Sequence, residues 1–203
     1  MIAIIDYDAG NTFNVQKALQ HIGLDAVLTA DRDTILAADG VILPGVGAYA
    51  SAVSVLRERG LIDVIHEVVE RNIPLLGICL GMQLLFDESE EYGPTPGLGI
   101  IPGTVKAIPN NLGLRVPHMG WNQNTLCRKD SAFSDVSDKY TYFVHSYYVE
   151  TDSQYVITTA DYGIKVPGIV EKGNVYGMQF HPEKSGAVGL NLLRTFGNII
   201  VKK

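Results

Sequence analysis

The sequence is poor in cysteine, in basic residues and in long hydrophobic runs. Its two cysteines, Cys79 and Cys127, form neither a disulfide framework nor the spacing of metal ligands, so we expect no disulfide and no metal. There are 16 lysines and arginines against 22 aspartates and glutamates, a net charge of −6, and no basic run that would bind phosphates. No apolar run approaches the roughly 18 residues of a membrane span, and the N-terminus lacks the basic segment of a signal peptide. We therefore expect a cytoplasmic protein that binds neither nucleic acid nor membranes.

The apolar residues that are present suffice for one packed domain. Hydrophobic residues make up 46% of the 203 positions and charged residues 19%. A chain of this length buries about 70% of its unfolded surface without needing disulfides. We expect a single domain over residues 1–203.

The first half of the chain alternates two hydrophobic periodicities. Short apolar runs at residues 2–5, 41–43 and 74–78 are bounded by glycine, proline or aspartate, which is typical of buried strands. Between them, residues 15–22 and 61–69 carry apolar side chains at helical spacing. Strands and helices alternating in this way predict a parallel sheet with helices on both faces.

The second half is richer in short strand-like stretches. Residues 140–149, 155–160 and 164–170 are rich in tyrosine, valine, isoleucine and threonine, and their spacing predicts antiparallel hairpins. Residues 192–200 form an apolar helical face near the end of the chain. The fold expected is α/β: a flavodoxin-like, doubly wound sheet, parallel at its centre, with antiparallel strands added in the second half.

The sharpest local motif is Gly77-Ile78-Cys79-Leu80-Gly81, directly after an apolar strand. It has the form G-x-C-x-G, a cysteine version of the nucleophile elbow, in which glycines let the chain turn sharply from strand into helix. A cysteine at the start of a helix gains from the helix dipole, which favours the thiolate. The alternative is a buried core cysteine between two turn glycines.

A base for this cysteine is found in His181-Pro182-Glu183, which follows the strand-like residues 175–180. In an extended segment, His181 and Glu183 would point to the same side, so the carboxylate could orient the imidazole. The alternative is a strand end closed by a proline turn, with both side chains in water. Together with Cys79, the pair supplies a nucleophile, a base and an orienting carboxylate.

A third motif, Leu43-Pro44-Gly45-Val46-Gly47-Ala48, also follows an apolar strand. Glycines at this place can present backbone N–H groups to a negative oxygen, as an oxyanion hole requires. The stretch also fits a dinucleotide-binding fingerprint through Ala50, but it does not follow the first strand and the expected acid, Glu67, lies within a helical pattern.

These three motifs, in this order, resemble those of the class I (triad-type) glutamine amidotransferases, over essentially the whole chain. Within that family, the sequence is similar to the glutaminase subunits of imidazole glycerol phosphate synthases. The narrower similarity rests on segments outside the three motifs: Asp6-Tyr7 with Ala9-Gly10-Asn11, Pro117-His118-Met119-Gly120-Trp121-Asn122, Phe143-Val144-His145-Ser146-Tyr147-Tyr148, and Gln179-Phe180-His181-Pro182-Glu183-Lys184-Ser185. Asp8 and Thr12-Phe13 depart from the common pattern of the first loop.

The resemblance implies hydrolysis of L-glutamine to glutamate and ammonia, with no cofactor. It implies that Cys79 is the nucleophile, His181 the base and Glu183 its orienting group. The oxyanion hole would comprise Val46, Gly47 and Leu80, and the residues implied to bind the substrate are Gly47, Gln83, Glu91, Ser146 and Tyr147.

The resemblance also implies a partner, the cyclase subunit, which would receive the ammonia directly in a heterodimer. The residues implied for that interface are Asn11, Asn14, Met119, Trp121 and Lys184. Trp121, the only tryptophan, has polar neighbours and is expected to be an exposed anchor. The alternative is that Trp121 plugs the end of the sheet.

Three other functions remain open at this point. The chain could serve a different synthase, such as anthranilate or aminodeoxychorismate synthase. It could be a free-standing cysteine hydrolase of γ-glutamyl bonds, or a non-catalytic nucleotide-binding module built on the Gly45 loop.

Overall fold

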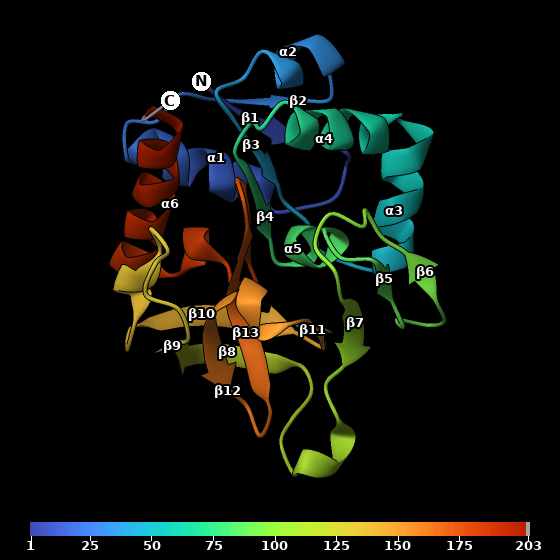
Figure 1. Ribbon diagram of the computed structural model, residues 1–203, viewed down its shortest axis with the longest axis vertical. Helices are drawn as coiled ribbons and strands as arrows, with labels where there is room; N and C mark the ends of the chain where they lie inside the picture. Colours follow the sequence, from blue (N-terminus) through green and yellow to red (C-terminus); the bar gives the residue numbers. More distant parts are fainter. Residues whose placement is uncertain (202–203) are drawn as a thin grey trace.

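An eight-stranded sheet forms the centre of the molecule in the computed structural model, which describes residues 1–201 (Figure 1). The strand order is β2-β1-β3-β4-β14-β13-β12-β9. From one edge to the other, the strands are β2 (Ala26–Thr29), β1 (Ile2–Ile5), β3 (Gly40–Leu43), β4 (Leu75–Ile78), β14 (Val175–Met178), β13 (Lys165–Lys172), β12 (Val156–Asp161) and β9 (Thr125–Leu126). The first five run parallel, and β13, β12 and β9 continue the sheet with antiparallel pairings. The predicted fold class is confirmed.

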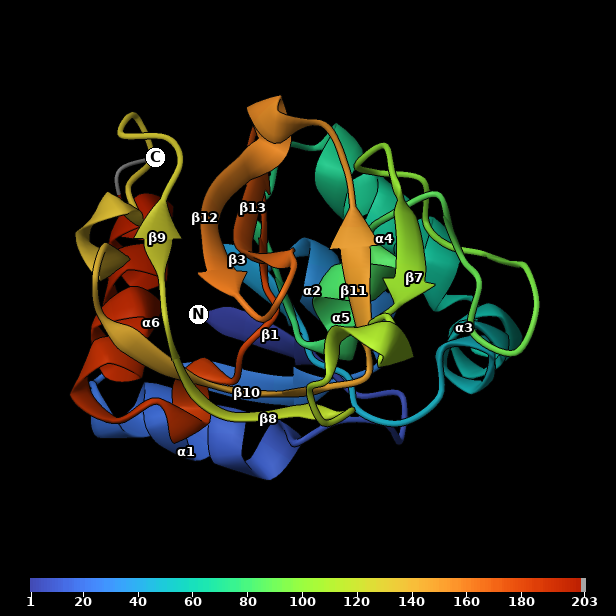
Figure 2. The same cartoon turned by 90° about the horizontal axis from the view of Figure 1, so that it is seen from below.

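Helices cover both faces of the parallel part (Figure 2). Because successive side chains of a strand point to opposite faces, the strands supply two separate apolar clusters. In one cluster, Ile2 and Ile4 pack with α1 (Thr12–His21) and α6 (Gly186–Val201). In the other, β-strand residues pack with the helices α2 (Arg32–Leu36), α3 (Tyr49–Glu58), α4 (Leu61–Glu70) and α5 (Leu80–Leu84).

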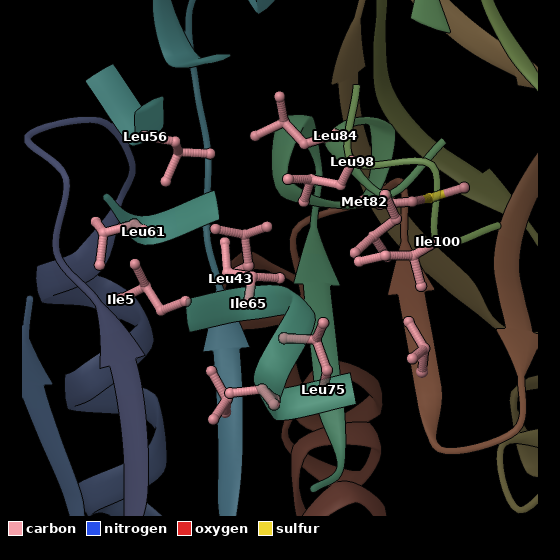
Figure 3. Packing of buried hydrophobic residues seen from close by; sticks show 14 of the residues in the cluster. Ile5, Leu43, Leu56, Leu61, Ile65, Leu75, Met82, Leu84, Leu98 and Ile100 are labelled. Carbon is pink, nitrogen blue, oxygen red and sulfur yellow. The ribbon is translucent and has the colours of Figure 1, made fainter. Parts of the chain in front are cut away.

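Figure 3 shows the second cluster at close range. Ile5, Leu43 and Leu75 project from three neighbouring parallel strands onto Leu61 and Ile65 of α4. All five side chains are excluded from water. Full burial of such a side chain is worth roughly 1.5–3 kcal/mol, so this contact fixes the parallel half as a rigid platform.

The second half departs from the prediction at residues 140–149, which do not form one strand. The chain leaves β10 (Tyr140–His145) at Ser146 and continues as β11 (Tyr147–Glu150). β10 pairs with β8 (His118–Gln123), whereas β11 pairs with β7 (Thr104–Ala107), so the stretch serves two different sheets (Figure 2). The short strands β5 (Glu88–Ser89) and β6 (Thr95–Pro96) complete the second of these sheets.

Three of the sequence motifs lie at the same edge of the central sheet. The Gly45 loop follows β3, Cys79 follows β4, and His181 lies beyond β14, and these three strands are neighbours in the order β3-β4-β14. The carboxyl ends of parallel strands are where α/β sheets place their ligands. None of the helices within residues 1–201 has the length and apolarity that crossing a membrane requires.

Candidate active site

Cys79 sits on a sharp turn between β4 and α5. Its backbone adopts a φ of +55°, a strained conformation for a residue with a side chain. The glycines on either side allow the turn: a Cβ on Gly81 would lie 1.9 Å from the carbonyl oxygen of Leu43, and a Cβ on Gly77 would lie 2.6 Å from that of Gly81. The elbow is therefore held by the close approach of α5 to the end of β3. Helix α5 is short and ends at Leu84.

His181 and Glu183 form a buried pair beside the cysteine. The Nδ1 atom of His181 lies 2.8 Å from Oε1 of Glu183, and neither side chain is more than 2% exposed. The reason differs from the prediction. Only His181 is extended; Pro182 opens a 3₁₀ turn over Pro182–Lys184, and this turn brings the carboxylate back to the imidazole.

Cys79 and Glu183 together control the charge of His181. Burial lowers the pKa of the His181 imidazole, but hydrogen bonds to Cys79 and Glu183 and the charges of the same two groups outweigh it and raise the pKa to about 9. The imidazole is therefore protonated at neutral pH. A protonated imidazole beside the candidate nucleophile can give its proton to a leaving group.

Asn11 donates a hydrogen bond to Glu183, a contact that the sequence did not reveal. Its Nδ2 donates to Oε1 of Glu183 at 2.9 Å, and its Oδ1 accepts from Asn14 Nδ2 at 2.6 Å. Asn11 was predicted as an interface residue, and that role stays a prediction; the structure shows that its amide also contacts the catalytic pair. Sequence offers no signal for this contact, because 172 positions separate the two residues.

A cavity of about 570 Å³ opens above Cys79 and His181. It is large enough for an amino acid. All the residues predicted to bind substrate contribute to its wall, as do several not predicted: the lining comprises Val46, Gly47, Cys79, Leu80, Gln83, Glu91, Tyr92, Val144, His145, Ser146, Tyr147, His181 and Lys184.

Gln83 lines this cavity and is hydrogen-bonded to a second buried glutamine, Gln179. Gln83 is buried, and its Nε2 donates to the carbonyl of Tyr147 and to Oε1 of Gln179, each at 3.0 Å. Gln179 in turn directs its Nε2 at the Cys79 sulfur, at 3.9 Å. Gln83 is thus fixed by the protein itself, and Gln179 is a neighbour of the nucleophile to which the sequence assigned no role.

Glu91 is anchored at the cavity wall by a backbone contact. Its Oε2 accepts a hydrogen bond of 2.7 Å from the N–H of Tyr49, the first residue of α3. A carboxylate at a helix N-terminus satisfies a free N–H group and is stabilised by the helix dipole. The Glu91 side chain is therefore held at the cavity wall by the first turn of α3.

The predicted oxyanion hole is occupied by the protein's own backbone. The N–H of Leu80, which was expected to be free, donates to the carbonyl oxygen of Gly45 at 3.3 Å. Val46 and Gly47 are exposed at the cavity wall. The structure therefore brings the predicted residues together but does not leave the Leu80 N–H open to a substrate oxygen.

Two of the predicted interface side chains project into solvent from β8. Met119 is 61% exposed and Trp121 is 54% exposed. The Trp121 ring makes a T-shaped contact with that of Tyr142, at 6.1 Å between centroids. The exposure of Trp121 is confirmed, and the alternative that it plugs the sheet is wrong. Lys184 and Asn14 are also exposed.

Neither a metal-binding group nor a disulfide is found among the described residues. Within residues 1–201 no group of three or more histidine, cysteine, aspartate or glutamate side chains is arranged to hold a metal ion. Both cysteines are free thiols, Cys79 buried and Cys127 exposed.

The fold and this site define the class of protein. The family model for class-I glutamine amidotransferases matches residues 3–198, and the chain belongs to that family. A solved structure described as a glutamine amidotransferase superimposes with a TM-score of 0.78, at 21% identity, covering 99% of this chain and 100% of that one.

Relatives narrow the comparison further. The chain is 52% identical to the imidazole glycerol phosphate synthase subunit HisH of Lactiplantibacillus plantarum, over 98% of this chain and 96% of that protein. It is 51% identical to the protein of the same name from Streptococcus sanguinis, over 97% and 95%.

Proposed function

We propose that the chain is a glutaminase subunit that hydrolyses L-glutamine to glutamate and ammonia and passes the ammonia to a cyclase subunit making imidazole glycerol phosphate. The observation that carries the proposal is that Cys79 and His181 line a cavity together with the predicted substrate residues, while Glu183 contacts His181 from behind the cavity wall. The names of the relatives support the choice of synthase and its place in histidine biosynthesis.

The chemistry follows from the charges in the site. The Cys79 thiolate adds to the side-chain carbonyl carbon of glutamine, and the carbonyl oxygen becomes an oxyanion. The His181 imidazolium gives its proton to the amide nitrogen, so that ammonia leaves and a thioester remains. The now neutral His181 takes a proton from water, which attacks the thioester and releases glutamate and Cys79. Glu183 fixes the Nδ1–H tautomer throughout.

The oxyanion must be stabilised by a backbone rearrangement. Because the Gly45 carbonyl now accepts from Leu80, rotation of the peptide between Gly45 and Val46 would free the Leu80 N–H and turn the Val46 N–H toward the cavity. Missing one such donor costs about 10²–10³ in kcat. The isolated chain should therefore be a slow enzyme, and a partner that favours the rotated peptide would accelerate it.

The amino-acid end of glutamine is held by the far wall of the cavity. The Glu91 carboxylate retains one oxygen beyond its contact with Tyr49, which suits the α-ammonium group. Ser146 and Tyr147 lie at the point where the chain passes from β10 to β11, and offer hydroxyl and backbone groups to the α-carboxylate.

The remaining expectations belong to the same proposal. The sheet takes strands from both halves of the chain, which supports one domain over residues 1–203, of which 202–203 lie outside the described residues. The heterodimer with the cyclase would use Asn11, Asn14, Met119, Trp121 and Lys184. Two free thiols are compatible with the reducing cytoplasm.

Ammonia release tests the proposal. The purified chain is incubated with glutamine alone, with a cyclase subunit, and with a chorismate-using synthase subunit. We expect glutamate and ammonia to form fastest with the cyclase. Activation by the chorismate enzyme alone would assign the chain to another synthase, and equal rates in all three would favour a free-standing hydrolase.

A further inference from the structure

Two buried histidines outside the triad form a directed chain of hydrogen bonds. His145 Nδ1 lies 2.8 Å from the carbonyl oxygen of Tyr147, and His145 Nε2 lies 3.0 Å from Nδ1 of His118. His118 Nε2 lies 3.2 Å from Nδ2 of Asn122. The proposed reaction uses neither histidine, and both rings are buried.

The partners determine where each proton sits. A carbonyl oxygen only accepts, so Nδ1 of His145 must carry the hydrogen, and in a neutral ring its Nε2 must accept. His118 then donates from Nδ1, and its Nε2 accepts from the Asn122 amide. Every donor points the same way, from Asn122 through His118 and His145 to Tyr147.

Both rings are neutral in the folded protein. Burial lowers the pKa of His118 to about 4. Burial first, then the nearby His118 ring and the charge of His181, lower the pKa of His145 to about 3, although the hydrogen bond to the Tyr147 carbonyl opposes the shift. The hydrogen-bond directions therefore hold across the physiological range.

Aromatic packing fixes the first ring. The His118 ring is stacked between those of Tyr162 and Phe143, with centroids 4.0 and 4.8 Å away. Its strand partner across the β8–β10 pair is His145. A ring held on both faces leaves little freedom for the hydrogen bonds at its edge.

The two ends of the chain of bonds lie at different surfaces. Tyr147, at one end, lines the cavity, and its carbonyl also accepts from Gln83 at 3.0 Å. At the other end is β8, where residues alternate: His118 and Asn122 face inward, whereas Met119 and Trp121 face solvent.

We propose that His118 and His145 are positioning residues, which hold the turn at Ser146–Tyr147 in the shape that binds glutamine and tie that turn to the solvent-facing strand β8. The enzymatic part rests on the proposed glutaminase function. Neither histidine transfers a proton to the substrate; they act through the Tyr147 backbone.

The tautomers can be read without any enzyme assay. In the chain labelled with ¹⁵N-histidine, only five rings contribute. We expect two neutral rings that carry hydrogen on Nδ1 alone and keep their shifts from pH 8 to pH 6, whereas the protonated ring of His181 carries hydrogen on both nitrogens. His118→Phe, which retains the stacking, should remove one of the two signals and move the Nε2 resonance of the other toward an unbonded acceptor. An Nε2–H tautomer in either ring of the wild type would overturn the proposal.

Kinetics test the positioning role in the complex with the cyclase. Loss of the His118 donor should raise the KM for glutamine by about tenfold, the value of one net hydrogen bond of about 1.4 kcal/mol, and leave kcat within about threefold. His118→Asn, whose amide can replace the Nδ1 donor, should restore most of the affinity. His21→Phe, at an exposed histidine of α1, is the matched control.

The outcomes separate the two proposals. Unchanged KM in a folded His118→Phe, or equal losses in His118→Phe and His118→Asn, would overturn the positioning role while glutaminase activity stands. A wild type that hydrolyses no glutamine would overturn the proposed function, and the tautomers would still decide the direction of the hydrogen bonds. If His118→Phe does not fold, two other measurements test the positioning role. They are the tautomers of the wild type and the KM of His118→Asn for glutamine, which is expected within about threefold of the wild-type value.

Discussion

At the scale of single residues, the charge of His181 links the chemistry of the site to the stability of the fold. The folded pKa of about 9 lies above the roughly 6.5 of an unfolded histidine. Stability from this group is therefore fully present below about pH 6.5 and is lost as the pH rises through 9. His118 and His145 have lowered pKa values, so their contribution is present above about pH 6.5 and is lost as the pH falls toward 4 and 3.

Of these three histidines, only His181 therefore changes the stability of the fold between pH 6.5 and 9. We predict that the wild type loses on the order of 1–3 kcal/mol more unfolding free energy over this range than His181→Gln. Urea unfolding at both pH values measures the difference. His21→Gln should lose as much unfolding free energy as the wild type. If the wild type and His181→Gln lose the same amount between pH 6.5 and 9, the positive charge assigned to His181 is contradicted.

The two cysteines should react differently, because only one lies in the cavity. A glutamine-mimicking electrophile is expected to label Cys79 once per chain, whereas Cys127, which is exposed and does not line the cavity, should react only with small unspecific reagents. Peptide mapping by mass spectrometry gives the position. Cys127→Ser should be labelled as fully as the wild type and Cys79→Ser not at all; a label on Cys127 would refute the assignment.

At the scale of elements, the elbow depends on the space between α5 and β3. Gly81→Ala should lower stability by about 3 kcal/mol or more, because its Cβ would overlap the backbone carbonyl of Leu43, which cannot move aside. Gly173→Ala is the control: its φ of +60° is strained for alanine, but nothing lies within 4 Å, so about 1–2 kcal/mol is expected. Thermal unfolding measures the stability of both variants. Equal losses of stability would show that the backbone conformation of glycine, and not the close approach of α5 to β3, accounts for the effect of Gly81→Ala.

Elements with a strong local pattern could be predicted from the sequence, and those set by tertiary contacts could not. The strand before Cys79, the turn at its glycines and the helix over residues 61–69 each carry their own signal. The break at Ser146 carries none, because tyrosine and valine continue on both sides. It arises only because β10 and β11 pair with different strands.

At the scale of the whole molecule, the site joins residues from both ends of the chain. The order of motifs along the sequence predicted the roles of Cys79 and His181, and the strand order explains why they meet. The Asn11 contact to Glu183 and the Gly45 carbonyl against Leu80 were beyond prediction, since each depends on the direction of one amide or peptide group.

The solvent-facing side of strand β8 is the surface that we expect to bind the cyclase subunit. Trp121→Ala should weaken binding of the cyclase by about 2 kcal/mol, roughly 30-fold in Kd, because aromatic anchors dominate interface energies. Calorimetric titration measures it, with Cys79 labelling as the check on folding. Val201→Ala, which shortens an exposed apolar side chain at the end of α6, should bind normally. A variant that loses thermal stability but binds as the wild type would refute the interface role.

The position of the single tryptophan makes the protein its own optical reporter. Indole emission shifts to shorter wavelength when water around the ring is replaced by protein, and red-edge excitation excludes the ten tyrosines. Since the one fluorophore is half-exposed on β8, covering of this strand can be followed in real time on the unlabelled chain. The same emission, recorded while glutamine is added, would reveal whether binding in the cavity changes the surroundings of Trp121 on β8.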